Sequence, residues 1–135
     1  MEEFTYTLEF AVRDYECDLT GIVNNANYQH YLEHARHEFL KQRGVDFAAW
    51  FQRGISLVVV RIEIDFLFPL RSGDRFLVSV NPRHISRLRL GFDQGIFRLP
   101  DNKPILQSLV VASAINDRGR PEVPPELATL ILGEG

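Results

Sequence analysis

A chain of 135 residues with 45% apolar and 24% charged residues has the size and composition of one soluble globular domain, which we expect to span residues 1–135. The formal net charge of -3 argues against a nucleic-acid partner, because a duplex binder presents a basic face. No apolar run reaches the length of a membrane span and the N-terminus lacks the features of a secretory signal, so we expect a cytoplasmic protein.

The first element in the chain is a predicted strand from Phe4 to Val12, in which apolar and polar side chains alternate with a period of two. A loop follows over residues 14–23. Asn24 then provides an N-cap for the one long helical pattern, which ends near Arg43 before Gly44. One face of this helix is apolar and is expected to pack on a flat surface; it carries Tyr28, Tyr31, Leu32, Ala35 and Phe39.

Strand patterns dominate the rest of the chain, after a short predicted helix at residues 46–52. Strands are predicted at 57–68, 75–81, 87–97 and 105–116, and one helical turn at 126–132. In the first of these strands the alternation assigns six apolar residues to one face: Val58, Val60, Ile62, Ile64, Phe66 and Phe68.

This order of elements predicts an α+β domain, with helices on one face of a mostly antiparallel five-stranded sheet. One long helix cannot cover both faces of a sheet of that size. The uncovered apolar surface therefore indicates a homodimer or a larger homo-oligomer.

The loop between the first strand and the long helix begins the stretch around which the chain is organised, residues 13–40. Asp18 lies in this loop, shortly before a helix start whose first backbone N–H groups have no partner within the helix. A carboxylate and an anion-stabilising helix end are therefore expected close together.

The same loop and helix resemble the signature of hotdog-fold thioesterases of the 4-hydroxybenzoyl-CoA thioesterase family, in the run Arg13-x-x-Glu16-x-Asp18-x-x-Gly21-Ile22-Val23-x-x-x-Asn27-Tyr28 followed by Glu33-x-x-Arg36. A second block, residues 60–66 followed by Pro69 and Gly73-Asp74, is similar as well. The resemblance implies a hotdog fold, in which the five-stranded antiparallel sheet wraps around one long helix. It also implies a homodimer or homotetramer with active sites between subunits, hydrolysis of an acyl-CoA thioester, and no metal or redox cofactor.

The resemblance also assigns roles to residues. Asp18 would act as nucleophile or as general base, and the backbone N–H of Asn25 would polarise the thioester carbonyl. Gly21, Val23 and Tyr28 would contact the substrate, although packing in the core is the alternative for an aromatic residue on an apolar helix face. Arg87 and Arg89 would hold the CoA phosphates, or would only keep a sheet edge soluble.

Other functions fit parts of the sequence. Residues 23–28 also look like plant acyl-acyl-carrier-protein (acyl-ACP) thioesterases, but Thr20 and Ile22 stand where that pattern has Asn and His. In an enzyme of that type, Asp18 would lack the Asn and His side chains that accompany the aspartate. An acyl-ACP thioesterase and a non-catalytic acyl-CoA-binding homo-oligomer are therefore the alternatives, and a hotdog dehydratase is disfavoured because the loop has no Asp/His pair.

Two further groups of residues suggest rival chemistry. Cys17, the single cysteine, is a rival nucleophile, but adjacent residues of an extended segment point in opposite directions, so we expect it to be buried and inert. His30, His34 and His37 are spaced along one polar helix face. We expect this face to contact solvent or another subunit instead of a metal ion.

Overall fold

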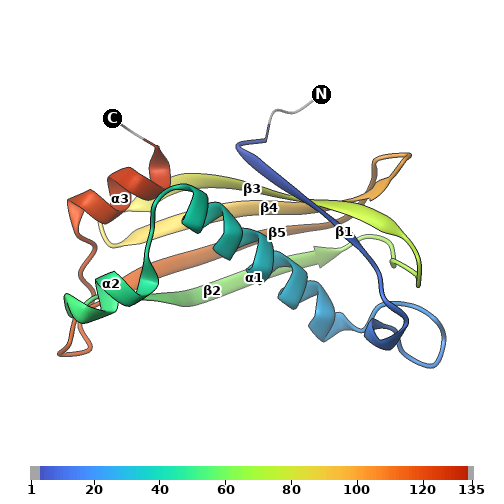
Figure 1. The fold of residues 1–135 in the computed structure, drawn as a ribbon, viewed down its shortest axis with the longest axis horizontal. Coiled ribbons are helices and arrows are strands. Elements are labelled where there is room, and N and C mark those ends of the chain that lie inside the picture. The colour runs from blue at the N-terminus through green and yellow to red at the C-terminus, as the bar shows by residue number, and fades with distance from the viewer. Residues whose placement is uncertain (1–3, 134–135) are drawn as a thin grey trace.

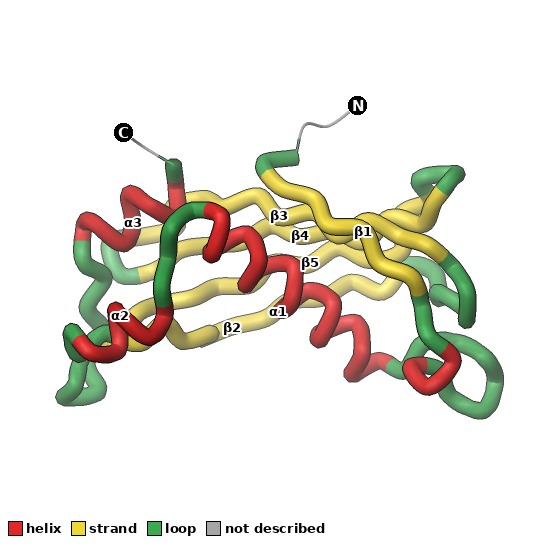
Figure 2. Tube along the Cα trace, in the orientation of Figure 1, coloured by secondary structure: helices red, strands yellow, loops and turns green. Residues whose placement is uncertain are grey.

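The computed structural model describes residues 4–133; residues 1–3 and 134–135 of the predicted domain lie outside the described residues. Five strands form one antiparallel sheet in the order β1-β3-β4-β5-β2, and the long helix α1 crosses one face of it (Figures 1 and 2). The predicted α+β architecture is confirmed. Along the chain the elements are β1 (Tyr6–Ala11), the 3-10 turn η1 (Asp14–Glu16), α1 (Asn25–Gln42), α2 (Phe47–Gln52), β2 (Ser56–Phe66), β3 (Arg75–Ser86), β4 (Arg89–Leu99), β5 (Lys103–Ile115) and α3 (Pro125–Leu132).

Helix α1 begins and ends where the capping residues predict. The side-chain oxygen of Asn24 accepts a hydrogen bond from the Ala26 amide at 2.9 Å, which satisfies one of the free donors of the first turn. After Arg43 the chain turns at Gly44, whose φ of 84° favours glycine. All five residues of the predicted apolar face are buried, and Arg36 and Leu40 are buried with them.

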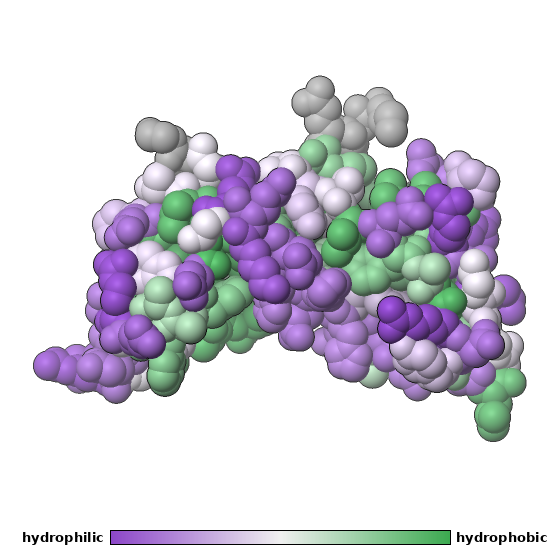
Figure 3. Space-filling view, viewed as in Figure 1, coloured by the Kyte–Doolittle hydropathy of each residue, from purple (hydrophilic) through white to green (hydrophobic). Residues whose placement is uncertain are grey.

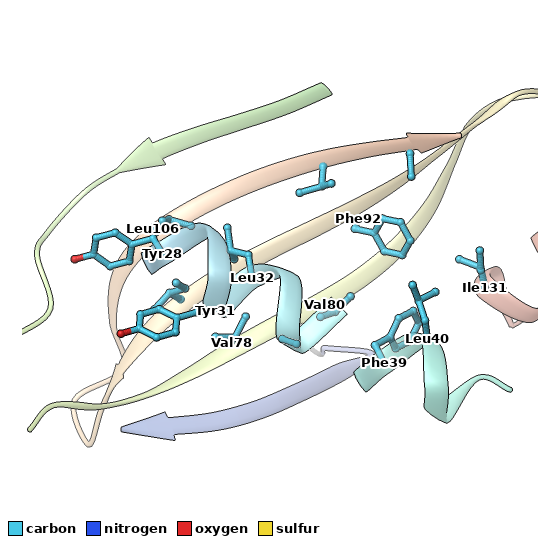
Figure 4. Close-up of a cluster of buried hydrophobic side chains, with 14 of the residues drawn as sticks. Tyr28, Tyr31, Leu32, Phe39, Leu40, Val78, Val80, Phe92, Leu106 and Ile131 are labelled. Atoms are coloured by element: carbon cyan, nitrogen blue, oxygen red, sulfur yellow. The ribbon is translucent and has the colours of Figure 1, made fainter. Parts of the chain in front are cut away.

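The core lies between α1 and the inner face of the sheet. Figure 4 shows α1 side chains, among them Leu32 and Phe39, packed against Val78, Val80 and Phe92 of β3 and β4. Phe39 is 0% exposed, and full burial of such a side chain contributes roughly 1.5–3 kcal/mol. This packing holds the start of α1, and the loop before it, in a defined place on the sheet.

Strand β2 faces the core with different residues from those the alternation predicts. Its register on β5 shifts between Val59 and Arg61, so a bulge at this point moves the side chains that follow to the opposite face. Leu57 before the bulge and Ile64 after it therefore both pack against the core. The assignment of Val58 and Val60 to the same face as Ile64 was wrong, because a period of two does not continue through a bulge.

Strand β3 continues through Pro82, where the sequence pattern predicts an end. Pro82 pairs with Phe92 of β4, and the strand reaches Ser86. The neighbouring strand β1 last pairs at Tyr6 with Val80. Pro82 therefore lies where the β1 side of the strand is open, and its missing N–H breaks no ladder hydrogen bond.

The two sheet edges differ in character. Strand β1 is short and its inward side chains pack on α1, whereas β2 is 11 residues long and carries exposed apolar side chains, including Val59 at 45% and Ile62 at 42%. Within residues 4–133, no helix is long and apolar enough to cross a membrane. Strand β2 thus leaves apolar side chains uncovered within the described chain.

Candidate active site

The loop that carries Asp18 is a small hairpin closed by backbone hydrogen bonds. The Asp18 amide donates to the Ile22 carbonyl at 2.8 Å, and the Asn24 amide donates to the Glu16 carbonyl at 3.0 Å. Gly21, with φ at 81°, allows the tight turn at the tip. The hairpin therefore fixes the backbone of Asp18 relative to the first turn of α1.

Thr20 holds the carboxylate of Asp18. The Thr20 hydroxyl donates to Asp18 Oδ1 at 2.6 Å and the Thr20 amide donates to the same oxygen at 2.8 Å. These bonds, with the hydroxyl as the largest cause, lower the pKa of Asp18 below its usual range. The side chain is exposed and ionised at neutral pH. Thr20 stands where the acyl-ACP thioesterase pattern has Asn, and in the structure it is the hydrogen-bond partner of Asp18.

The start of α1 offers a free amide. Asn25 is the first residue of α1, and within residues 4–133 its N–H has no hydrogen-bond acceptor, while the Asn24 side chain is occupied by Ala26. The hairpin places Asp18 opposite Ile22, three residues before Asn25, which is about 10 Å along an extended chain. A carboxylate and an anion-binding helix end therefore lie at the same end of the sheet.

Cys17 is oriented away from Asp18. Its side chain is half-buried and packs against the core, whereas Asp18 is exposed. Burial, followed by the charges of Asp14, Asp18 and Glu16, raises the pKa of the Cys17 thiol. A protonated thiol that points into the core is a poor nucleophile, which agrees with the expected inert role.

Two of the predicted substrate contacts are core residues. Tyr28 and Val23 are each 3% exposed, and both are tied to Leu70: the Leu70 amide donates to the Tyr28 hydroxyl at 2.9 Å, and the Val23 amide donates to the Leu70 carbonyl at 2.9 Å. In Figure 4 the hydroxyl groups of Tyr28 and Tyr31 point the same way, out of the apolar cluster. Their position anchors the start of α1, and Gly21 alone of the three predicted contacts is exposed.

The predicted phosphate-binding residues lie far from Asp18 in one chain. Arg87 and Arg89 are exposed at the turn between β3 and β4, whereas Ile22 of the Asp18 hairpin pairs with Arg71, which precedes the opposite end of β3. The 12 residues of β3 span about 36 Å at 3.3 Å per residue. Figure 1 shows the two segments at opposite ends of the sheet, so a single chain does not bring them together.

The three histidines of α1 have separate partners. His30 lies 3.3 Å from the Asn27 side chain, the His34 ring contacts Phe10 edge-on, and His37 packs against Phe47. Nowhere in the described part of the chain do three His, Cys, Asp or Glu side chains gather so that they could hold a metal ion.

Two of the hollows beside α1 are lined by residues near its start, and the outward face of the helix is polar (Figure 3). The hollow toward β1 has a volume of about 530 Å³ and is lined by Leu8, Phe10, Arg13, Glu16, Tyr31 and His34, among others. The hollow toward β2 has a volume of about 280 Å³ and is lined by Ala26, Gln29, His30, Leu32, Glu33, Arg36, Ile62 and Val110. The second hollow begins at Ala26, in the first turn of the helix.

A five-stranded antiparallel sheet that curves around one long helix, with a carboxylate in the loop before that helix, defines a hotdog-fold protein. Solved structures agree with this fold. The crystal structure of a 1,4-dihydroxy-2-naphthoyl-CoA thioesterase from Synechocystis superposes with a TM-score of 0.88 at 20% identity, covering 96% of each chain.

The model of the thioesterase-like superfamily matches residues 12–131, and the chain belongs to this family. The acyl-acyl carrier protein thioesterase ATL3, chloroplastic, of Arabidopsis thaliana is 41% identical over 121 residues, which cover 90% of this chain and 63% of that protein. This chain thus spans less than two thirds of that relative. The 1,4-dihydroxy-2-naphthoyl-CoA hydrolase of Thermosynechococcus vestitus is 26% identical over 129 residues, covering 94% of this chain and 86% of that protein.

Proposed function

We propose that the protein is an acyl-CoA thioesterase, which hydrolyses an acyl thioester to a carboxylic acid and a free thiol. One observation carries the proposal: an ionised Asp18, whose carboxylate accepts two hydrogen bonds from Thr20, lies in a closed hairpin shortly before a helix start with a free amide. Membership of the thioesterase-like superfamily supports it, as do relatives that are named thioester hydrolases.

The chemistry needs no group beyond these. Asp18 as general base accepts a proton from a water molecule, whose oxygen bonds to the thioester carbonyl carbon; as nucleophile, its own oxygen forms that bond and water then hydrolyses the mixed anhydride. In both routes the carbon–sulfur bond breaks and sulfur leaves as a thiolate, which takes up a proton. The amide of Asn25 stabilises the negative carbonyl oxygen, a role that contributes roughly 2.7–4 kcal/mol in other enzymes.

The distance between Asp18 and the arginine turn supports a homo-oligomeric enzyme. If Arg87 and Arg89 bind the CoA phosphates, they act with the Asp18 of another copy, because in one chain β3 separates them by about 36 Å. We therefore propose a homodimer or homotetramer with shared active sites. A cytoplasmic location and the number of copies stay predictions.

A second substrate class has its own support. The ATL3 relative, at 41% identity, is named an acyl-ACP thioesterase, so an acyl chain carried by a protein is the alternative to acyl-CoA. Both carriers present the same phosphopantetheine thioester to the enzyme. Parallel assays with one acyl group on CoA and on carrier protein separate the two by kcat/KM.

The test of catalysis is a thiol-release assay over benzoyl, naphthoyl and medium to long fatty acyl thioesters. Asp18→Asn is expected to lower kcat by roughly 100- to 10,000-fold, the range for loss of a general base, with an unchanged melting temperature because the side chain is exposed. Full activity of this variant would place the chemistry elsewhere. Tight binding of acyl-CoA without turnover of any substrate would favour the non-catalytic alternative.

A further inference from the structure

The side chain of Glu16 connects the Asp18 hairpin to helix α1. Glu16 ends the 3-10 turn η1 and lies two residues before Asp18. Its carboxylate oxygen Oε1 accepts a hydrogen bond from the Tyr31 hydroxyl at 2.8 Å and another from the Arg13 amide at 2.8 Å. One oxygen atom therefore links the segment before the hairpin to the second turn of the helix.

The backbone of Glu16 makes a second connection to the same helix. Its carbonyl oxygen accepts a hydrogen bond from the Asn27 side-chain amide at 2.8 Å and another from the amide of Asn24, the N-cap, at 3.0 Å. Residues 70–72, which precede β3, also bond to this loop. Within the described residues, however, every hydrogen bond between loop residues 14–23 and α1 with its N-cap ends on Glu16.

Tyr31 gives this connection a fixed point. The residue is 4% exposed, and its ring packs against Phe76 and Phe10, with ring centroids 4.8 Å and 5.5 Å apart. Its hydroxyl points out of the apolar cluster (Figure 4) and donates to Glu16. A ring held by close packing cannot follow a moving loop, so the hydroxyl sets where the Glu16 carboxylate lies.

Asp18 has no such anchor of its own. In the part of the chain that the structure describes, its hydrogen bonds all stay inside the hairpin, with Thr20, Gly21 and Ile22. A shift of the whole hairpin relative to α1 would therefore break no bond of Asp18. The proposed hydrolysis needs Asp18 and the Asn25 amide at a fixed separation, because both act on one carbonyl group.

We propose that Glu16 is a positioning residue, which fixes the Asp18 hairpin at the separation from the Asn25 amide that thioester hydrolysis requires. The inference rests on the proposed function and adds a residue that acts through Asp18 and not on the substrate. A displacement of about 1 Å in such a site lowers the rate by about 100-fold. Loss of Glu16 is therefore expected to lower kcat, whereas KM and the pKa of Asp18, which is lowered mainly by Thr20, stay unchanged.

The test compares variants of Glu16 and Tyr31 in the thiol-release assay. Glu16→Ala removes both side-chain bonds and is expected to lower kcat by about 100-fold, with KM within about twofold and the acid limb of the kcat/KM profile at its original pH. Glu16→Gln is expected to keep kcat within about threefold, because both bonds end on Oε1 and an amide oxygen accepts both. Tyr31→Phe is expected to lower kcat about tenfold alone, but no further in combination with Glu16→Ala, since the bond is then already lost.

Glu9→Ala is the matched control. Glu9 lines the same hollow toward β1 as Glu16, but it lies on β1 itself and pairs with Arg75. This control is expected to leave kcat unchanged. If Glu16→Ala does not fold by circular dichroism, Tyr31→Phe alone decides, through a lowered kcat at unchanged KM.

Hydrogen exchange of backbone amides separates failure of this inference from failure of the proposed function. Glu16→Ala is expected to speed exchange of the Asp18 and Asn24 amides by about tenfold, and Glu9→Ala to leave it unchanged, whether or not the chain hydrolyses a thioester. Full kcat with unchanged exchange in Glu16→Ala would overturn the proposal. A raised KM would assign Glu16 to the substrate instead, and a Glu16→Gln variant as slow as Glu16→Ala would show that the negative charge and not the position matters.

Discussion

Replacing Tyr28 with phenylalanine separates a structural role from a role in substrate binding. The change removes one oxygen atom, which accepts a hydrogen bond from the buried Leu70 amide at 2.9 Å. The ring is 3% exposed, so no water can take over as acceptor without rearrangement. A buried donor left without a partner costs about 1–3 kcal/mol, and we expect Tyr28→Phe to lose this amount of unfolding free energy.

The assay pairs thermal unfolding with steady-state kinetics. For a domain of this size, each kcal/mol lowers the melting temperature by about 3–5 °C, and KM is expected to stay within about twofold. Tyr31→Phe is the control, since Glu16 Oε1 accepts from both the Tyr31 hydroxyl and the Arg13 amide and keeps one bond after the change. It is expected to cost less. An unchanged melting temperature with a KM raised severalfold would refute the reasoning and place the Tyr28 hydroxyl in the acyl pocket.

Three further predictions test the loop and the helix start. Thr20→Val removes the hydroxyl that most lowers the pKa of Asp18, so this pKa rises toward its usual range and the acid limb of the kcat/KM profile moves to higher pH. Thr20→Ser keeps a hydroxyl and is expected to leave the acid limb in place. If neither variant moves the acid limb, Asp18 is not the group that titrates there. Cys17→Ser is expected to retain kcat within about twofold, because burial keeps the thiol protonated, and a loss of 100-fold or more would restore it as the nucleophile. Asn24→Ala removes the cap on Ala26 and is expected to cost about 1 kcal/mol in denaturant unfolding, whereas Asn24→Asp keeps an acceptor and is expected to cost less.

Local patterns in the sequence predict the elements better than they predict which way the side chains face. The start of α1 at Asn25 and its end before Gly44 follow from capping chemistry within a few residues, and both are confirmed. The faces of β2 depend on the bulge beside Val60, which arises from pairing with β5, a strand more than 40 residues later in the chain. The same holds for Pro82, which is tolerated in β3 because β1 has already ended. Neither the bulge in β2 nor the end of β1 beside Pro82 can be predicted from the residues adjacent in sequence.

In the candidate site, too, some features follow from residues close in sequence and others depend on contacts between distant elements. The motif places Asp18 in a loop before a helix, and the structure adds a contact that lowers the pKa of Asp18, the hydrogen bond from the hydroxyl of a neighbour two residues away. Arg36 belongs to the same motif, but its burial beside Gln94 depends on packing between α1 and β4.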